Sequence, residues 1–225
     1  MSEKEYIQEA CRELNSFFTN IGFIISKNGL IAKRKIDSDI TQEIFCQITN
    51  YHEVIIHFSV YSKKVKKWLK ETYQLENAEV SGLGGQLGYI SKQNVWKTWQ
   101  IGKSDIAKSQ FLKEAKEMID TFLIPYFDTF YNIPSMLDNI CYQGGISTQT
   151  PIFAPPISFV LQYGTVEQAQ ILLENYLINN PKQYQSIQRH KTYFDKDTAL
   201  FPIPFIGADQ IKTGINNGVI IDFNK

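Results

Sequence analysis

Residues 23–36, FIISKNGLIAKRKI, decide the fold. They place the dipeptide Asn28-Gly29 between two short runs that are rich in Ile and Leu. Asn-Gly favours the positive φ angles that a tight hairpin turn requires. We therefore expect residues 23–26 and 30–36 to form two antiparallel strands.

The two-residue alternation continues beyond this hairpin. In residues 41–49 and 54–61, apolar side chains such as Ile44 and Ile56 alternate with side chains such as Gln47. Strands joined by such short connections must run antiparallel, because a parallel crossover needs about a dozen residues or more. The segment therefore predicts a meander sheet.

A helix is expected before the sheet and others after it. Ser2 and Glu5 have the spacing of a capping box, and apolar residues then recur at three- and four-residue steps as far as Ile21, before Gly22. Further along, the patterns predict a helix over 62–73, two short strands over 87–91 and 95–101, a long helix from Ser104 or Asp105 to Pro125, and a helix over 134–140.

The last third of the chain has a different character. Residues 144–156 carry Gly, Pro and hydroxyl residues typical of a long loop or linker. Thr165 and Gln168 form a second capping-box pattern in front of a helix. The remaining patterns predict a helix over 181–193, an extended segment over 201–205 and a strand over 219–223.

These elements predict an α+β fold. It has an N-terminal helix, an antiparallel meander sheet of five or six strands with helices on one face, and a C-terminal helical extension. Residues 1–142 are expected to form the α+β domain. Residues 143–225 are expected to form a loop and helical extension that packs on the first part.

Composition and charge exclude several classes of protein. The 225 residues hold 23 Lys+Arg and 23 Asp+Glu, and 43% are hydrophobic. This composition excludes a disordered tail and a strongly cationic binder of nucleic acid or membrane. Three cysteines without a CxxC pair, and no visible signal peptide, favour free thiols in a reducing cytoplasm. We expect a soluble protein that makes no contact with a membrane.

The first three fifths of the chain contain a series of short motifs, each present once: Gly22-Phe23, Lys27-Asn28-Gly29, Arg34, Gly85-Gln86-Leu87-Gly88-Tyr89, Trp96, Trp99 and Leu123-Ile124-Pro125. Over about residues 6–140 their order resembles an uncharacterised bacterial α+β family known only as a domain of unknown function. The resemblance implies an antiparallel sheet with helices on one face, and protein-interaction or toxin-immunity roles. It implies no catalytic residues.

No motif for chemistry stands out. In residues 82–88 a dinucleotide-binding fingerprint would need its last glycine at the position of Leu87, so a loop is favoured, with backbone anion binding as the alternative. His52 and His57 are expected on opposite faces of a strand, and His190 has no ligand at metal-binding spacing. We therefore predict no catalytic residue, no metal and no cofactor.

Charge and aromatic residues indicate binding instead. Residues 27–70 hold nine Lys/Arg and four Asp/Glu, and several of these lysines share one side of the helix predicted over 62–73. Trp96 and Trp99 are three residues apart, so on a strand one of them must leave the core side. The candidate binding residues are Lys63, Lys64, Lys67, Lys70, Gln86, Trp96 and Trp99.

The leading hypothesis is a non-catalytic binding protein, of an immunity type or another kind of interaction module, with an acidic protein partner. A small-molecule-binding protein or small hydrolase, with its site between the sheet and residues 144–156, is the first alternative. Nucleic-acid binding through the lysine-rich helix is the second, although the chain lacks a recognisable reading motif. The oligomeric state stays open.

Overall fold

The computed structural model describes residues 1–74, 83–91, 95–146, 154–195 and 199–222. The chain forms two compact units: the first is Met1–Tyr61 with Gly84–Phe130, and the second is Ser62–Leu83 with Tyr131–Lys225. The helix before residues 84–130 (Lys63–Tyr73) and the helix after them (Ile133–Gln143) both belong to the second unit. This grouping differs from the expected division after residue 142.

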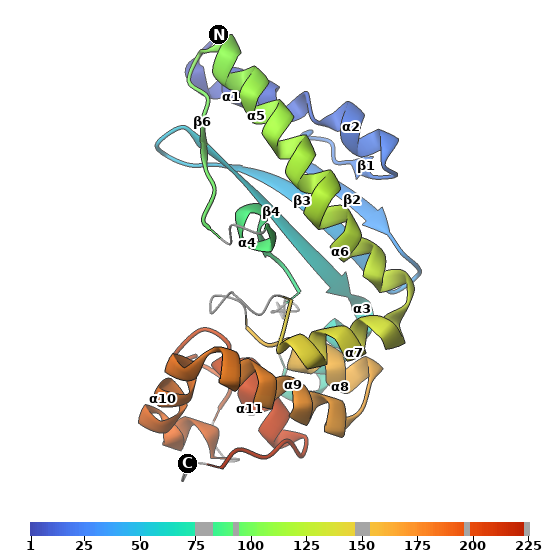
Figure 1. Cartoon of the computed structure of the whole chain (residues 1–225), viewed down its shortest axis with the longest axis vertical. Coiled ribbons are helices and arrows are strands. Elements are labelled where there is room, and N and C mark those ends of the chain that lie inside the picture. The colour runs from blue at the N-terminus through green and yellow to red at the C-terminus, as the bar shows by residue number, and fades with distance from the viewer. Residues whose placement is uncertain (75–82, 92–94, 147–153, 196–198, 223–225) are drawn as a thin grey trace. The chain divides into compact units, whose positions relative to one another are not determined.

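The first unit is built on an antiparallel sheet of six strands (Figure 1). The strand order is β1-β2-β3-β4-β5, and β6 pairs with β4. The α+β class, the meander and the antiparallel pairing are thus as predicted. The strands are β1 (Ile24–Ile25), β2 (Ile31–Lys35), β3 (Ile40–Ile48), β4 (Glu53–Ser62), β5 (Gly85–Gln86) and β6 (Trp99–Gln100).

Helices cover one face of this sheet. The capping box of Ser2 and Glu5 is present, but the expected single N-terminal helix is two helices. They separate where the Leu14 N–H bonds the Cys11 carbonyl in a tighter turn, which buries Leu14 completely. The helical elements of this unit are α1 (Glu3–Arg12), α2 (Asn15–Asn20), α4 (Leu87–Ile90), α5 (Asp105–Met118), the π-helical turn Ile119–Leu123, α6 (Ile124–Asp128) and the 3₁₀ turn Thr129–Tyr131, whose last residue belongs to the second unit.

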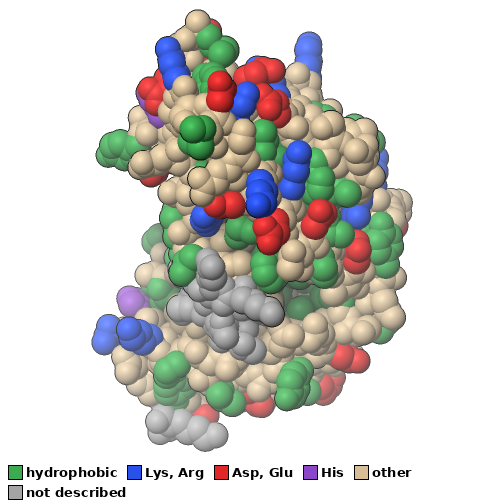
Figure 2. Space-filling model, turned by 45° about the horizontal axis from the view of Figure 1, so that its top comes forward, with side chains coloured by type: hydrophobic (Ala, Val, Ile, Leu, Met, Phe, Trp, Pro, Cys, Tyr) green, Lys and Arg blue, Asp and Glu red, His purple; other side chains and the backbone are tan. Residues whose placement is uncertain are grey.

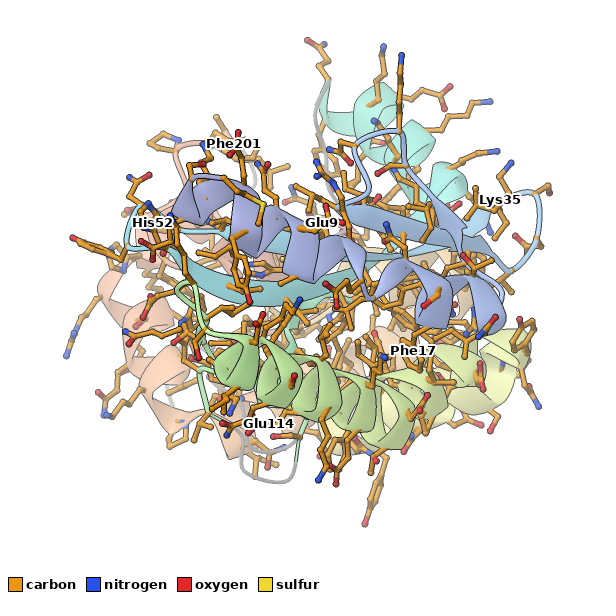
Figure 3. The ribbon with its side chains drawn as sticks, turned by 90° about the horizontal axis from the view of Figure 1, so that it is seen from above. Glu9, Phe17, Lys35, His52, Glu114 and Phe201 are labelled. Carbon is orange, nitrogen blue, oxygen red and sulfur yellow. The ribbon has the colours of Figure 1, made fainter. Side chains whose placement is uncertain are left out.

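The core of the first unit lies between the sheet and its helices. Alternate residues of β3 and β4, such as Ile44 and Phe58, are almost fully buried, and so is Cys11 on α1. Helices α1 and α5 run side by side, linked by a hydrogen bond between Tyr6 and Asp105 (Figures 1 and 3). Burial of this apolar face is the main source of stability in such a layered fold.

Two expected strands are corrected. Residues 87–91 form α4 rather than a strand, because the Gln86 side chain caps this turn by accepting the Gly88 N–H. In the segment expected over 95–101, the pairing with β4 is restricted to Trp99–Gln100.

The second unit is helical among its described residues, and the capping box of Thr165 and Gln168 is present. The strand expected over 219–223 is not formed in residues 219–222, and Phe223 lies outside the described residues. Instead, the Gln170 side chain bonds both the N–H and the carbonyl of Ile220. The helical elements are α3 (Lys63–Tyr73), α7 (Ile133–Gln143), α8 (Ile157–Tyr163), α9 (Val166–Asn179), α10 (Pro181–Arg189), the 3₁₀ turn Lys191–Phe194 and α11 (Ala208–Asn216).

Candidate functional site

Three of the seven candidate binding residues, Gln86, Trp96 and Trp99, lie together around the short segment from Trp96 to Trp99. This segment is held by Gln86, which is only 3% exposed. The Gln86 Oε1 atom accepts the N–H groups of Gly88, at 2.8 Å, and of Lys97, at 3.3 Å. Its Nε2 atom donates to the Lys97 carbonyl. Gln86 therefore acts as an internal clamp on the segment.

Trp96 lies at the exposed end of an aromatic cluster. The residue is 53% exposed, and its ring meets those of His57 and Tyr89 edge-on, with centroids 6.3 and 6.0 Å away. His57 stacks on Phe45 with centroids 4.8 Å apart. We call the surface formed by Phe45, His57, Tyr89 and Trp96 the aromatic face. Phe45 and His57 alternate with the buried residues of β3 and β4, so they lie on the sheet face opposite α1 and α5.

His57 lies in the middle of the aromatic face. Its Nε2 atom is 2.8 Å from Oε1 of Gln47. Partial burial lowers the pKa of His57, because desolvation disfavours the charged imidazolium. Burial at the centre of the aromatic face therefore favours the uncharged imidazole.

Trp99 takes the opposite role to Trp96, which agrees with their predicted separation. It is 6% exposed and packs edge-on against Phe111. Its Nε1 donates to Oε2 of Glu114 over 3.0 Å. Lys97 Nζ lies 2.8 Å from the same oxygen, and Gln110 donates to the other carboxylate oxygen. The bond from Lys97, followed by those from Gln110 and Trp99, lowers the pKa of Glu114 to about 2.

A hollow of about 370 Å³ opens beside this Lys97–Glu114 pair. One wall is α5, on whose flank Glu114 lies (Figure 3), and the wall continues into the π-helical turn. Lys97 and Glu114 were not among the predicted residues. The one sequence pattern that singles out Glu114 is its four-residue spacing from Gln110. This spacing allows a side-chain hydrogen bond along one helix but does not indicate a cavity. The hollow is lined by Ser91, Lys97, Glu114, Glu117, Met118, Thr121 and Phe122.

The four candidate lysines all lie on α3, in the second unit, and are exposed. Val65 and Leu69 on the same helix are buried, so the helix presents a basic side to solvent. Lys64 is also anchored: it donates to the Gln162 carbonyl and lies 4.8 Å from the centre of the Tyr163 ring. Lys67 pairs with Glu71 over 3.8 Å.

The basic stretch over residues 27–70 is divided between the two units. In the first unit, Lys33 pairs with Glu43 over 2.6 Å and Arg34 with Asp128 over 2.8 Å. Over the face drawn in Figure 2, basic and acidic side chains are likewise interspersed rather than gathered by sign. The lysines of α3 are thus a local feature of one helix.

A second hollow, of about 800 Å³, lies in the second unit between α9, α10 and residues 220–222. Tyr184 and Asp222 both line this hollow, and the Tyr184 hydroxyl donates to the Asp222 carbonyl over 2.6 Å. Gln170 bonds the backbone of Ile220 at 2.8 and 3.1 Å. The described end of the chain therefore forms part of this hollow's wall.

Among the described residues, no group of three or more His, Cys, Asp or Glu side chains could hold a metal ion. Cys11, Cys46 and Cys141 are buried free thiols, and burial raises the pKa of Cys141 to about 12. In the same described part, no helix is long and apolar enough to cross a membrane. Most of the loop named in the small-molecule alternative, residues 147–153, lies outside the described residues.

Comparison of the chain with protein-family models, with curated proteins and with solved structures gives no match.

Proposed function

We propose that the protein is a non-catalytic binding protein whose aromatic face docks a protein partner. One observation carries the proposal: Trp96 is half exposed although the backbone beside it is clamped by the buried amide of Gln86. Tryptophan is enriched among the residues that dominate interface energies. A side chain already fixed in position loses little entropy when a partner covers it.

The charge of α3 supports an acidic partner. Exposed lysines attract an acidic surface during diffusional encounter, even when the whole chain is neutral. An immunity-type role, which the family resemblance implies, is one form of this proposal.

The test uses the full chain as bait in extracts of the cells that make it. Trp96→Ala removes the exposed ring of the aromatic face. Tyr51→Ala is the matched control, because Tyr51 is 87% exposed in the turn before β4 and lies outside the aromatic face. Captured proteins are compared at low and at high salt.

We expect a protein that is retained by the wild type and by Tyr51→Ala but is lost with Trp96→Ala. Weaker capture at high salt would support an acidic partner. Capture of no protein at low salt, or equal capture by all three chains, would overturn the proposal.

A further inference from the structure

The hollow beside Glu114 is a second feature, separate from the aromatic face. Its volume of about 370 Å³ is near the lower end of the range of about 300–1,000 Å³ that is usual for small-molecule sites. A ligand of metabolite size would fit, whereas a folded partner would not enter.

The hollow presents charges of both signs. Glu114 and Glu117 are three residues apart on α5, so they are neighbours on one side of the helix. Lys97 reaches the same hollow from the segment before β6. Its ammonium has three N–H donors, of which Glu114 receives one over 2.8 Å. Glu117 is exposed, and no bond from another described side chain engages its carboxylate.

The π-helical turn completes the apolar part of the wall. It spans Ile119–Leu123 and directly follows α5. Its wider winding brings the sequence neighbours Thr121 and Phe122 to the hollow together with Met118. Single π-helical turns inside helices are frequent at functional sites, where they redirect side chains. Here the turn places an apolar surface beside the three charged groups.

We infer that this hollow binds a small zwitterion with an apolar side chain, which is the chemistry of a free apolar α-amino acid. The ligand ammonium lies between the carboxylates of Glu114 and Glu117, and its carboxylate accepts from Lys97. Its side chain packs on Met118 and Phe122. Glu114 is held by Lys97, Trp99 and Gln110 before the ligand arrives, so the site is largely preformed.

Calorimetric titration of the intact chain at pH 7 tests the inference. The ligands are L-leucine, L-methionine and L-phenylalanine, each followed by derivatives that lack one charge. N-acetyl-leucine lacks the ammonium and leucinamide lacks the carboxylate. We expect at least one free amino acid to bind, and the leucine derivatives to bind about tenfold or more weakly than leucine, because each loses a charged hydrogen bond.

Variants locate the binding. Glu117→Gln should weaken leucine binding about tenfold and leave the weak binding of N-acetyl-leucine unchanged, since that ligand has no ammonium. Asp120→Asn is the control, because Asp120 is exposed on the π-helical turn but does not line the hollow. Absence of binding by all three amino acids, or equal leucine affinity in Glu117→Gln and the wild type, would overturn the inference. Neither result bears on the capture experiment with Trp96→Ala.

Discussion

Gln86 shows how a buried polar side chain can determine the position of an exposed one. Its amide bonds the N–H of Gly88 and both backbone groups of Lys97. These bonds fix the residue next to Trp96 without a regular strand at that point. A buried amide that satisfies backbone groups in this way stabilises the fold only while all its partners stay in place.

Replacing Gln86 by leucine is expected to lower the free energy of unfolding by about 1–3 kcal/mol, because backbone groups of Gly88 and Lys97 lose their partners. Urea unfolding measures the change. Gln100→Leu is the control, because the Gln100 side chain is exposed and its one hydrogen bond within the described residues is an exposed one to the Glu53 side chain, so its loss should matter little. Equal effects of the two variants would contradict the role of Gln86 as a clamp.

Glu114 predicts a pH dependence of stability. Its pKa falls from 4.5 to about 2 on folding, so the stability it contributes is fully present above about pH 4.5. That contribution is lost as the pH falls from about 4.5 towards 2. The difference in unfolding free energy between the wild type and Glu114→Gln should therefore shrink between pH 6 and pH 3 in urea titrations. A difference that stays constant over this range would argue against the prediction.

At the residue scale, sequence patterns identified side chains of unusual type but not their partners. Trp96 and Trp99 stood out, and their spacing predicts that one leaves the core. Glu114 did not stand out, because its donors Lys97 and Trp99 come from another segment, which tertiary folding brings to α5. For the same reason, Gln86 could be selected as a candidate although its role as a clamp could not be foreseen.

Among the elements, α7 and α9 make an unusually close approach. Gly144 ends α7 with φ at +74°, and a Cβ atom there would lie 2.5 Å from the Tyr176 nitrogen. Asn175 and Asn179 of α9 donate to the carbonyls of Cys141 and Gln143 over 2.9 and 2.8 Å. The C-terminal end of α7 is thus capped by the side chains of its neighbour.

Gly144→Ala should therefore destabilise the protein by about 2–4 kcal/mol, because it adds a steric clash to the strain of a positive φ. Gly102→Ala provides the comparison. Its φ is also positive, at +56°, but a Cβ there meets nothing within 4 Å, so a loss of about 1 kcal/mol is expected. Thermal or urea unfolding distinguishes the two. Similar losses in the two variants would mean that the backbone of α9 shifts enough to accommodate the added Cβ atom, and would contradict the prediction.

Prediction of elements succeeded where periodicity and caps act locally. The long strands β3 and β4 and the caps at Ser2 and Thr165 followed from alternation and spacing. Residues 87–91 were predicted wrongly because a side-chain cap turned a short apolar run into a helix. Residues 219–222 failed because the partner of the backbone is Gln170, a side chain, and not another strand.

For the whole molecule, the decisive property is that both units are discontinuous in sequence. The first unit closes only when residues 84–130 return to the meander, and the second needs α3 together with residues beyond 131. Periodicity detects each element but carries no information about which distant elements pack together. The expected boundary at residue 142 followed a change in composition. The contacts instead place residues 131–142 in the same unit as residues 143–225.

A fragment of residues 1–142 tests this grouping. It would contain α3 and almost all of α7 but would lack α8 and α9, which pack on them in the full chain. Buried residues such as Leu69 and Leu137 would then be exposed. We expect the fragment to bind a hydrophobic dye and to aggregate more readily than the full chain. A fragment that stays monomeric and unfolds as cooperatively as the full chain would contradict the grouping.

The position of α3 also affects how the protein is made. The ribosome completes α3, with the apolar stripe of Val65 and Leu69, well before α8 is synthesised. At rates of about 5–20 residues per second, that stripe waits several seconds for its contacts with α8. The order of synthesis therefore leaves the apolar stripe of α3 uncovered until α8 emerges, and exposed apolar surface of this kind favours aggregation of the nascent chain.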